Sequence, residues 1–144
     1  MALKQIYLLD TNTVYELAKN EPNEKLTICM DAYSHFSVIS STVWYEMLYG
    51  IEKLPDGSRK KKLDLFVTEY VQSVFPILPY DEHCASLQAH IDAKMKIKGT
   101  PVPYKDAQIA ATALANNLVL VTRNVKDFEP ICSEFPLHVE NWFE

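Results

Sequence analysis

Short runs of apolar residues alternate along the chain with longer stretches in which apolar positions recur every three or four residues. The short runs have the length of strands rather than helices, and we interpret them as buried strands. They cover residues 4–9, 36–39, 74–78, 118–122 and 137–139. Pro76 lies inside the third run, which favours an edge strand or a bulge there.

The stretches between these runs carry helix signals. Val14, Leu17 and Ala18 have the spacing of one helix face, and Thr11–Thr13 in front of them can cap that helix. Further helices are predicted over residues 24–33, from the cap at 40–42 to about 54, and over 60–72, 81–98 and 106–115. Strands that alternate with helices predict the α/β class: a three-layer α/β/α sandwich with a mainly parallel sheet of four to five strands.

The composition is that of one folded domain. The chain has 144 residues, of which 48% are hydrophobic and 23% charged, so we expect a single domain over residues 1–144. Three cysteines without CxxC spacing predict neither a disulfide framework nor a zinc site. No apolar run approaches the roughly 20 residues of a membrane span, and Asp10 comes too early for a secretory signal. We therefore expect a cytoplasmic protein with no membrane partner.

Polar residues follow the predicted strands at the positions where a doubly wound sheet binds its ligands. Asp10 ends the first strand, and Asn124 follows the fourth strand by two residues. Asp106 begins the helix that leads into the fourth strand, and Glu46 lies in the helix after the second. Ligands of such sheets bind beyond the carboxyl ends of the strands, where the strand order reverses. We expect these four side chains to surround one crevice.

Helix geometry adds to this expectation. Asp106 heads a stripe with Ile109, Ala110 and Ala113, so its carboxylate should face the sheet. Glu46 shares its side of the helix with Gly50, and a glycine inside a helix often permits close approach of another element. Carboxylates beside apolar faces are costly unless they are paired, hydrogen-bonded or bound to metal.

Each residue taken alone has a simpler interpretation. Asp10 could be only a turn or cap residue, and Asp106 could only complement the positive end of its helix. Glu46 could be an ordinary solvated helix residue. The joint placement of the three around one predicted crevice is the argument for a functional site.

Three clustered carboxylates repel one another, and a hard divalent cation with oxygen ligands relieves this repulsion. Mg²⁺ uses one or two carboxylates and keeps several waters, which leaves room for phosphate oxygens. Such an ion activates water and clamps oxygens in phosphodiester cleavage. The formal net charge of −5 excludes a protein that binds nucleic acid by phosphate neutralisation over its whole surface. Any nucleic-acid function therefore needs local basic patches or bound cations.

Several of these segments, in order along the chain, resemble PIN-domain ribonucleases, and more closely the VapC toxins of toxin–antitoxin pairs. Any one motif is weak, whereas the ordered set is fairly specific and runs over almost the whole chain. The segments are Leu8–Asn12, Ser40–Gly50, Asp106–Ala113, Leu120–Phe128 and Val139–Trp142.

The resemblance implies an endoribonuclease that depends on Mg²⁺ or Mn²⁺ and is occluded by a cognate antitoxin protein. Asp10 and Asp106 match direct metal ligands, and Glu46 matches a third acidic residue that often acts through water. Asn12 and Thr122 match polar residues that orient the site. The family often has a fourth acid after the last core strand. Here that position is Asn124, with Asp127 three residues on as a candidate replacement.

Other functions stay open beside the RNA-cleaving toxin. One is a PIN-like nuclease that acts on DNA or in RNA processing outside a toxin system; growth arrest relieved by a neighbouring gene would separate the two. Another is an inactive PIN-fold binding module, which Asn124 keeps open. A phosphatase of the α/β class would need an aspartate where Asn12 stands.

The remaining candidates concern binding rather than chemistry. The basic run Arg59–Lys62 is interpreted as a solvated face, whereas Lys94, Lys96, Lys98 and Lys105 are better placed to meet phosphates. Tyr104 could stack on a base or be an ordinary tyrosine. We expect a homodimer. Tyr15, Leu17, Met30 and Tyr33 are candidates for a dimer or antitoxin face, with core packing as an equal alternative.

Overall fold

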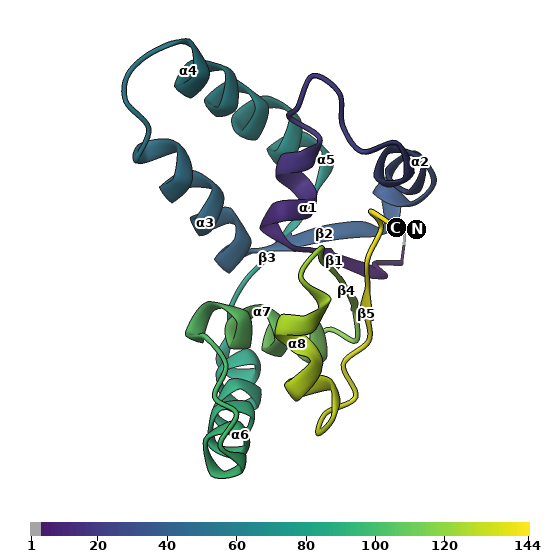
Figure 1. Ribbon diagram of the computed structural model, residues 1–144, viewed down its shortest axis with the longest axis vertical. Coiled ribbons are helices and arrows are strands. Elements are labelled where there is room, and N and C mark those ends of the chain that lie inside the picture. Colours follow the sequence, from purple (N-terminus) through teal and green to yellow (C-terminus); the bar gives the residue numbers. More distant parts are fainter. Residues whose placement is uncertain (1–3) are drawn as a thin grey trace.

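The computed structural model describes residues 4–144, and it contains the predicted parallel sheet (Figure 1). The sheet has the strand order β3-β2-β1-β4-β5, and every neighbouring pair is parallel. Its strands are β1 (Tyr7–Leu9), β2 (Ser37–Ser40), β3 (Ile77–Leu78), β4 (Val119–Val121) and β5 (Val139–Glu140). Each lies in or overlaps a predicted run, and β3 is the edge strand that Pro76 favoured. The chain builds the sheet outward from β1 first on one side, to β2 and β3, and then on the other, to β4 and β5. The place between β1 and β4 where this direction reverses is the switch point of the sheet.

Helices cover both faces of this sheet, as the alternating pattern predicted. In Figure 1, α1, α3, α4 and α5 lie on one side of the sheet, and α6, α7 and α8 on the other. The α-helices are α1 (Thr11–Glu16), α2 (Glu24–Tyr33), α3 (Ser41–Glu52), α4 (Ser58–Leu65), α5 (Gln72–Val74), α6 (Glu82–Lys98), α7 (Tyr104–Ala115) and α8 (Val125–Cys132). The short segments η1 (Ser34–Phe36), a 3₁₀ turn, and η2 (Phe66–Val71), a π-helix, complete the list.

The sequence pattern explains where the core lies. Leu8, Leu9 and Leu120 of the two central strands are fully buried, as residues of a parallel sheet covered on both faces should be. Between Ala107 and Ala113 of α7 only Gln108 is not buried, and the small alanines let α6 pack close beside it. The expected α/β sandwich is therefore observed.

Two helical regions differ from the sequence expectation. Helix α8 was not predicted. It has eight residues, of which only Phe128 and Ile131 are buried, so its apolar spacing is a weak signal, and Pro130 inside it removes one backbone donor. The helix predicted over residues 60–72 starts at Ser58 and changes to a π-helix at Phe66. Apolar spacing does not distinguish the i→i+5 hydrogen bonds of such a segment from the ordinary helical ones.

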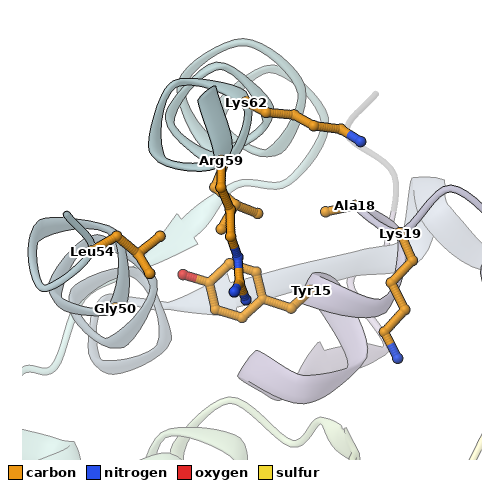
Figure 2. A pocket seen from close by; sticks show the side chains of 8 residues that line it. Tyr15, Ala18, Lys19, Gly50, Leu54, Arg59 and Lys62 are labelled. Carbon is orange, nitrogen blue, oxygen red and sulfur yellow. The ribbon is translucent and has the colours of Figure 1, made fainter. Parts of the chain in front are cut away.

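Gly50 permits the close approach of α1 to α3. A Cβ atom at Gly50 would lie 3.2 Å from the Tyr15 hydroxyl, which donates a hydrogen bond of 2.6 Å to the Met47 carbonyl. Figure 2 shows this hydroxyl pointing toward α3, with Arg59 and Lys62 of α4 across a cavity of about 420 Å³. Arg59 and Lys62 line this cavity but stay exposed, as Lys61 does, so the basic run is the solvated face that the sequence predicted.

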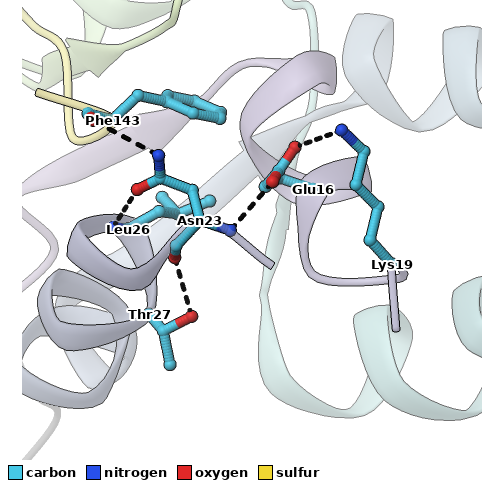
Figure 3. A network of polar contacts seen from close by, with 6 residues as sticks. All are labelled: Glu16, Lys19, Asn23, Leu26, Thr27 and Phe143. Carbon is cyan, nitrogen blue, oxygen red and sulfur yellow. Dashed lines mark hydrogen bonds and ion pairs between the residues drawn. The ribbon is translucent and has the colours of Figure 1, made fainter. Parts of the chain in front are cut away.

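A buried carboxylate fixes the connection between α1 and α2. Glu16 accepts hydrogen bonds from the Asn23 backbone N–H at 2.9 Å and pairs with Lys19 at 2.8 Å (Figure 3). Burial opposes the charged form of Glu16, but the bonds from Lys19 and Asn23 outweigh it and lower its pKa. Asn23 also caps α2 through Leu26 and donates to the Phe143 carbonyl, so the C-terminal segment joins the same network.

Core packing accounts for most of the residues considered for a dimer or antitoxin face. Met30 is 3% exposed, and Leu17 packs against the core. The ring of Tyr33 packs against those of Tyr7 and Trp142 at centroid distances of 5.3 and 5.7 Å. Along the part of the chain that the structure describes, no helix is both long and apolar enough to cross a membrane.

Substitution of two isoleucines, one buried and one exposed, tests the description of the core given above. We expect Ile109→Ala, at a site 1% exposed, to lower the free energy of unfolding by about 2–5 kcal/mol, because it leaves a cavity between α7 and the sheet. The matched control Ile97→Ala removes the same atoms at a position 84% exposed and should change stability by less than about 0.5 kcal/mol. Urea unfolding measures both, and equal losses would contradict the packing described.

Candidate functional site

Asp10 lies at the point where the strand order reverses. Its backbone N–H donates to the Val121 carbonyl at 2.9 Å, which fixes the end of β1 against the end of β4. One carboxylate oxygen accepts from the Thr11 N–H at 2.8 Å, so Asp10 is indeed the N-cap of α1. The other oxygen accepts from the Thr122 hydroxyl at 2.8 Å. With 8% exposure, Asp10 is both a cap and a buried carboxylate at the switch point.

Asn12 and Thr122 connect the two strand ends. The Asn12 amide donates to the Thr122 hydroxyl at 3.3 Å and to Asp10 at 3.4 Å. The Asn12 carbonyl oxygen accepts from the Arg123 backbone N–H at 3.1 Å. Thr122 in turn accepts from the Asn124 N–H at 3.1 Å. These bonds hold the Asp10 carboxylate in one orientation. The sequence resemblance implies the same role for Asn12 and Thr122, namely that they orient the site.

Glu46 and Asp106 face this carboxylate from two different helices. Both are half-buried, Glu46 in α3 and Asp106 in the first turn of α7. Burial raises the pKa of Glu46, and the negative charges of Asp10 and Asp106 raise it further, while Lys105 opposes them. Burial and the charge of Asp10 raise the pKa of Asp106 to about 6. The three carboxylates therefore act on one another electrostatically, although they come from distant parts of the sequence.

Asp127 belongs to this group, whereas the Asn124 side chain contributes little to it. Asp127 lies in the first turn of α8, and its charge raises the pKa of both Asp10 and Asp106 after the larger effect of burial. Asn124 is the exposed N-cap residue of α8, but its side chain makes no capping hydrogen bond. The fourth carboxylate near the site is thus that of Asp127.

Thr11 is a polar group of the site that the sequence argument treated only as part of a cap. Its hydroxyl approaches Glu46 and favours the charged form of that carboxylate. The oxygen is nevertheless buried and has no hydrogen-bond partner of normal geometry. The sequence does indicate that Thr11 belongs to the site, because it lies between Asp10 and Asn12 at the same strand end.

The residues of the site fit a hard divalent cation by their chemistry. All candidate donors are oxygen atoms, and the raised pKa values show negative charge that the protein itself does not compensate. Within residues 4–144, no three Asp, Glu, His or Cys side chains already lie at a separation suited to holding one ion. This arrangement fits an ion held by one or two carboxylates with water as its remaining ligands.

The raised pKa of Asp106 predicts that this carboxylate destabilises the metal-free fold. Its pKa is about 6 in the folded protein and near 3.8 when unperturbed, so the cost of ionisation is present above pH 6 and disappears toward pH 4. In EDTA at pH 7.5, Asp106→Asn should raise the free energy of unfolding by about 1 kcal/mol, a figure reduced for the half-exposed carboxylate.

Urea unfolding of both proteins at pH 7.5 and 4.5 measures this effect, and the gain should shrink at the lower pH. Asp31→Asn, in the exposed part of α2, is the control and should show no such dependence. A gain of the same size at both pH values would contradict the electrostatic origin.

Comparison with known protein families places most of the chain in one of them. Residues 7–132 match the family described as "PIN domain". The chain is 35% identical to the tRNA(fMet)-specific endonuclease VapC of Salmonella typhimurium over 94% of this chain and 97% of that relative. It is 32% identical to Toxin FitB of Neisseria gonorrhoeae over 84% of this chain and 89% of that protein.

Solved structures show the same fold. The DNA-bound VapBC structure from Salmonella typhimurium has a TM-score of 0.83 and 32% identity, covering 96% of this chain and 98% of that one. The FitAcB structure from Neisseria gonorrhoeae has a TM-score of 0.86 and 28% identity, with 96% and 99% covered. The family match over residues 7–132 includes Asp10, Glu46, Asp106 and Asp127 of the candidate site.

Proposed function

This chain belongs to the PIN-domain family, among its VapC-type ribonucleases, and we propose that it is a metal-dependent endoribonuclease that cuts RNA phosphodiester bonds. Membership confirms the resemblance seen in the sequence. The observation that carries the proposal is the group of carboxylates Asp10, Glu46 and Asp106, whose charges act on one another at the switch point of the sheet.

Asp10 and Asp106 are the proposed direct ligands of Mg²⁺, with Mn²⁺ as a substitute, and Glu46 the third acidic group. When bound, the ion would supply charge for the phosphate oxygens and lower the pKa of water. Thr122 and Asn12 orient Asp10, and Thr11 lies beside Glu46. Since the protein carries a net charge of −5, neutralisation of this site is also what lets a polyanion approach.

The toxin of a toxin–antitoxin pair is the biological setting we propose. Relatives of this chain are named as a toxin and as VapC ribonucleases, and similar structures are described as toxin–antitoxin complexes. The proposed partners are accordingly an RNA substrate and a cognate antitoxin protein, and the proposed assembly contains a homodimer. Because the active centre is acidic, a basic antitoxin segment would suit it electrostatically.

Two substitutions test the nuclease. Asp10→Asn and Asp106→Asn keep the shape of each side chain but remove its charge, so each should lower RNA cleavage by about 10²-fold or more. Chelation by EDTA should stop the wild type, and added Mg²⁺ should restore it. Asp31→Asn is the matched control in exposed α2 and should cleave like the wild type.

Cleavage of end-labelled RNA, followed by gel electrophoresis, is the measurement. Mg²⁺ should also raise the melting temperature of the wild type more than that of Asp10→Asn. Undiminished cleavage by either carboxamide variant, or in EDTA, would refute the proposed chemistry.

Asp127 provides a separate test of the fourth acidic position. We propose that it replaces the acid missing at Asn124, because its charge reaches Asp10 and Asp106. Asp127→Asn should slow cleavage about 10- to 100-fold, as loss of an outer partner of a metal site does. Asn124→Ala, which removes a side chain without a capping bond, should cost less. Cleavage rates at saturating Mg²⁺ rank the two, and the reverse order would exclude this role for Asp127.

A further inference from the structure

A second cavity, of about 340 Å³, is lined by aromatic rings and by the chain neighbours of two of the carboxylates. Tyr45 of α3, Tyr104 of α7 and Tyr80 of the segment after β3 form its walls. All three elements begin at the edge of the sheet that the carboxyl ends of the strands form. Parallel α/β sheets bind their ligands at this edge. The size lies in the range of small-ligand sites.

The cavity is linked to the candidate active site through two adjacent pairs of residues. Tyr45 directly precedes Glu46 in α3, and Lys105 directly precedes Asp106 in α7. The Lys105 ammonium lies 5.5 Å from the centre of the Tyr45 ring, and Lys105 directly precedes Asp106, so this lysine connects the aromatic wall with the candidate active site. A ligand that occupies both places must be anionic at one end and flat at the other.

Tyr45, one of the three tyrosines of the cavity, also stacks on Tyr49, which is not part of the cavity lining. The rings of Tyr45 and Tyr49 are parallel within 7°, with centroids 5.9 Å apart. The Lys105 ammonium lies 5.5 Å from the Tyr45 ring and 5.6 Å from that of Tyr49. Tyr45 and Tyr104 are 53% and 66% exposed, so their rings are open to a ligand.

Polar groups in the same cavity could recognise the edge of a planar ligand. The Thr42 hydroxyl bonds to the Gln108 carbonyl oxygen at 3.3 Å, which orients that amide. Among residues 4–144, the Gln108 amino group donates no hydrogen bond, so it stays free to donate to a ligand. Aromatic faces combined with an amide are how proteins hold unstacked RNA bases.

From these observations we propose that the cavity is a subsite for one nucleobase of a single-stranded RNA whose phosphate lies at the carboxylates. The base stacks on Tyr45 and Tyr104, Gln108 and Thr42 contact its edge, and Lys105 neutralises the adjoining backbone. The subsite rests on the proposed nuclease function, because it is a place for the substrate of that reaction. It gives an acidic protein a way to select unpaired RNA without a broad basic surface.

Base-dependent binding tests the subsite. The probes are a fluorescent 12-nucleotide single-stranded RNA of mixed sequence and the same strand with every base replaced by an abasic ribose. All variants carry Asp106→Asn so that the strand stays intact. The parent should prefer the base-bearing strand. Tyr45→Ala and Tyr104→Ala should each weaken its binding about fivefold or more and leave abasic binding unchanged.

Matched variants separate stacking from folding effects. Tyr45→Phe keeps the ring and should bind like the parent. Tyr70→Ala removes a tyrosine that is 40% exposed on η2, away from the cavity, and should do the same. Melting temperatures identify any variant that is not folded. Equal binding of both strands by the parent, or full affinity in the folded alanine variants, would overturn the subsite.

Three further outcomes are distinguishable. If sedimentation shows that Tyr45→Ala and Tyr104→Ala split a dimer and RNA affinity follows that change, the cavity is a contact between copies and the proposal is wrong. If wild-type protein cleaves no RNA while the ring-dependent binding persists, the nuclease function fails and the subsite remains. If cleavage occurs and ring-dependent binding is missing, only the subsite fails.

Discussion

The repulsion between carboxylates held at the carboxyl ends of β1 and β4 is the constraint on which the rest of the structure depends. Asp10 is 8% exposed. Burial raises the pKa values of Glu46 and Asp106, and the charge of Asp10 raises them further. Left alone, such groups would move apart into water. The hydrogen bond from Thr122 and the main-chain bond to Val121 prevent this for Asp10, and two packed helices prevent it for the others. The buried residues of β1, β2 and β4 and the alanine-rich face of α7 supply stability, and the clustered carboxylates reduce it.

Much of this arrangement could be predicted from the sequence, for an identifiable reason. A parallel sheet buries both faces, so its strands appear as unbroken apolar runs, and Asp10 at the end of such a run is conspicuous. The periodicity of α7 placed Asp106 beside its apolar stripe in the same way. Helix α8 could not be predicted in the same way, because Phe128 and Ile131 alone give its short apolar face a weak signal. Asp127 could be named as a replacement only from the family pattern, since its effect on Asp10 and Asp106 depends on where α8 packs.

Thr11 and the tyrosine cavity show a second limit of sequence reasoning. The sequence identifies a threonine in a cap, but whether its hydroxyl finds a partner depends on α3, which lies thirty residues further along. Tyr45, Tyr80 and Tyr104 lie far apart in the sequence, without a shared period. They line one cavity only because α3, the segment after β3 and α7 all begin at one edge of the sheet. Which distant residues meet in one cavity therefore depends on the order of the strands in the sheet, and the spacing of residues along the chain does not show that order.

That common edge also explains how one short chain can combine recognition with chemistry. Adjacent positions of a helix point about 100° apart, because the helix has 3.6 residues per turn. In α3 the pair Tyr45 and Glu46, and in α7 the pair Lys105 and Asp106, therefore present one residue to the cavity and the next to the crevice. Both helices are anchored by buried residues, Met47 in α3 and Ile109 in α7. A base held on the tyrosines would thus be fixed relative to the carboxylates without a moving part, as rigid elements position a site better than loops do.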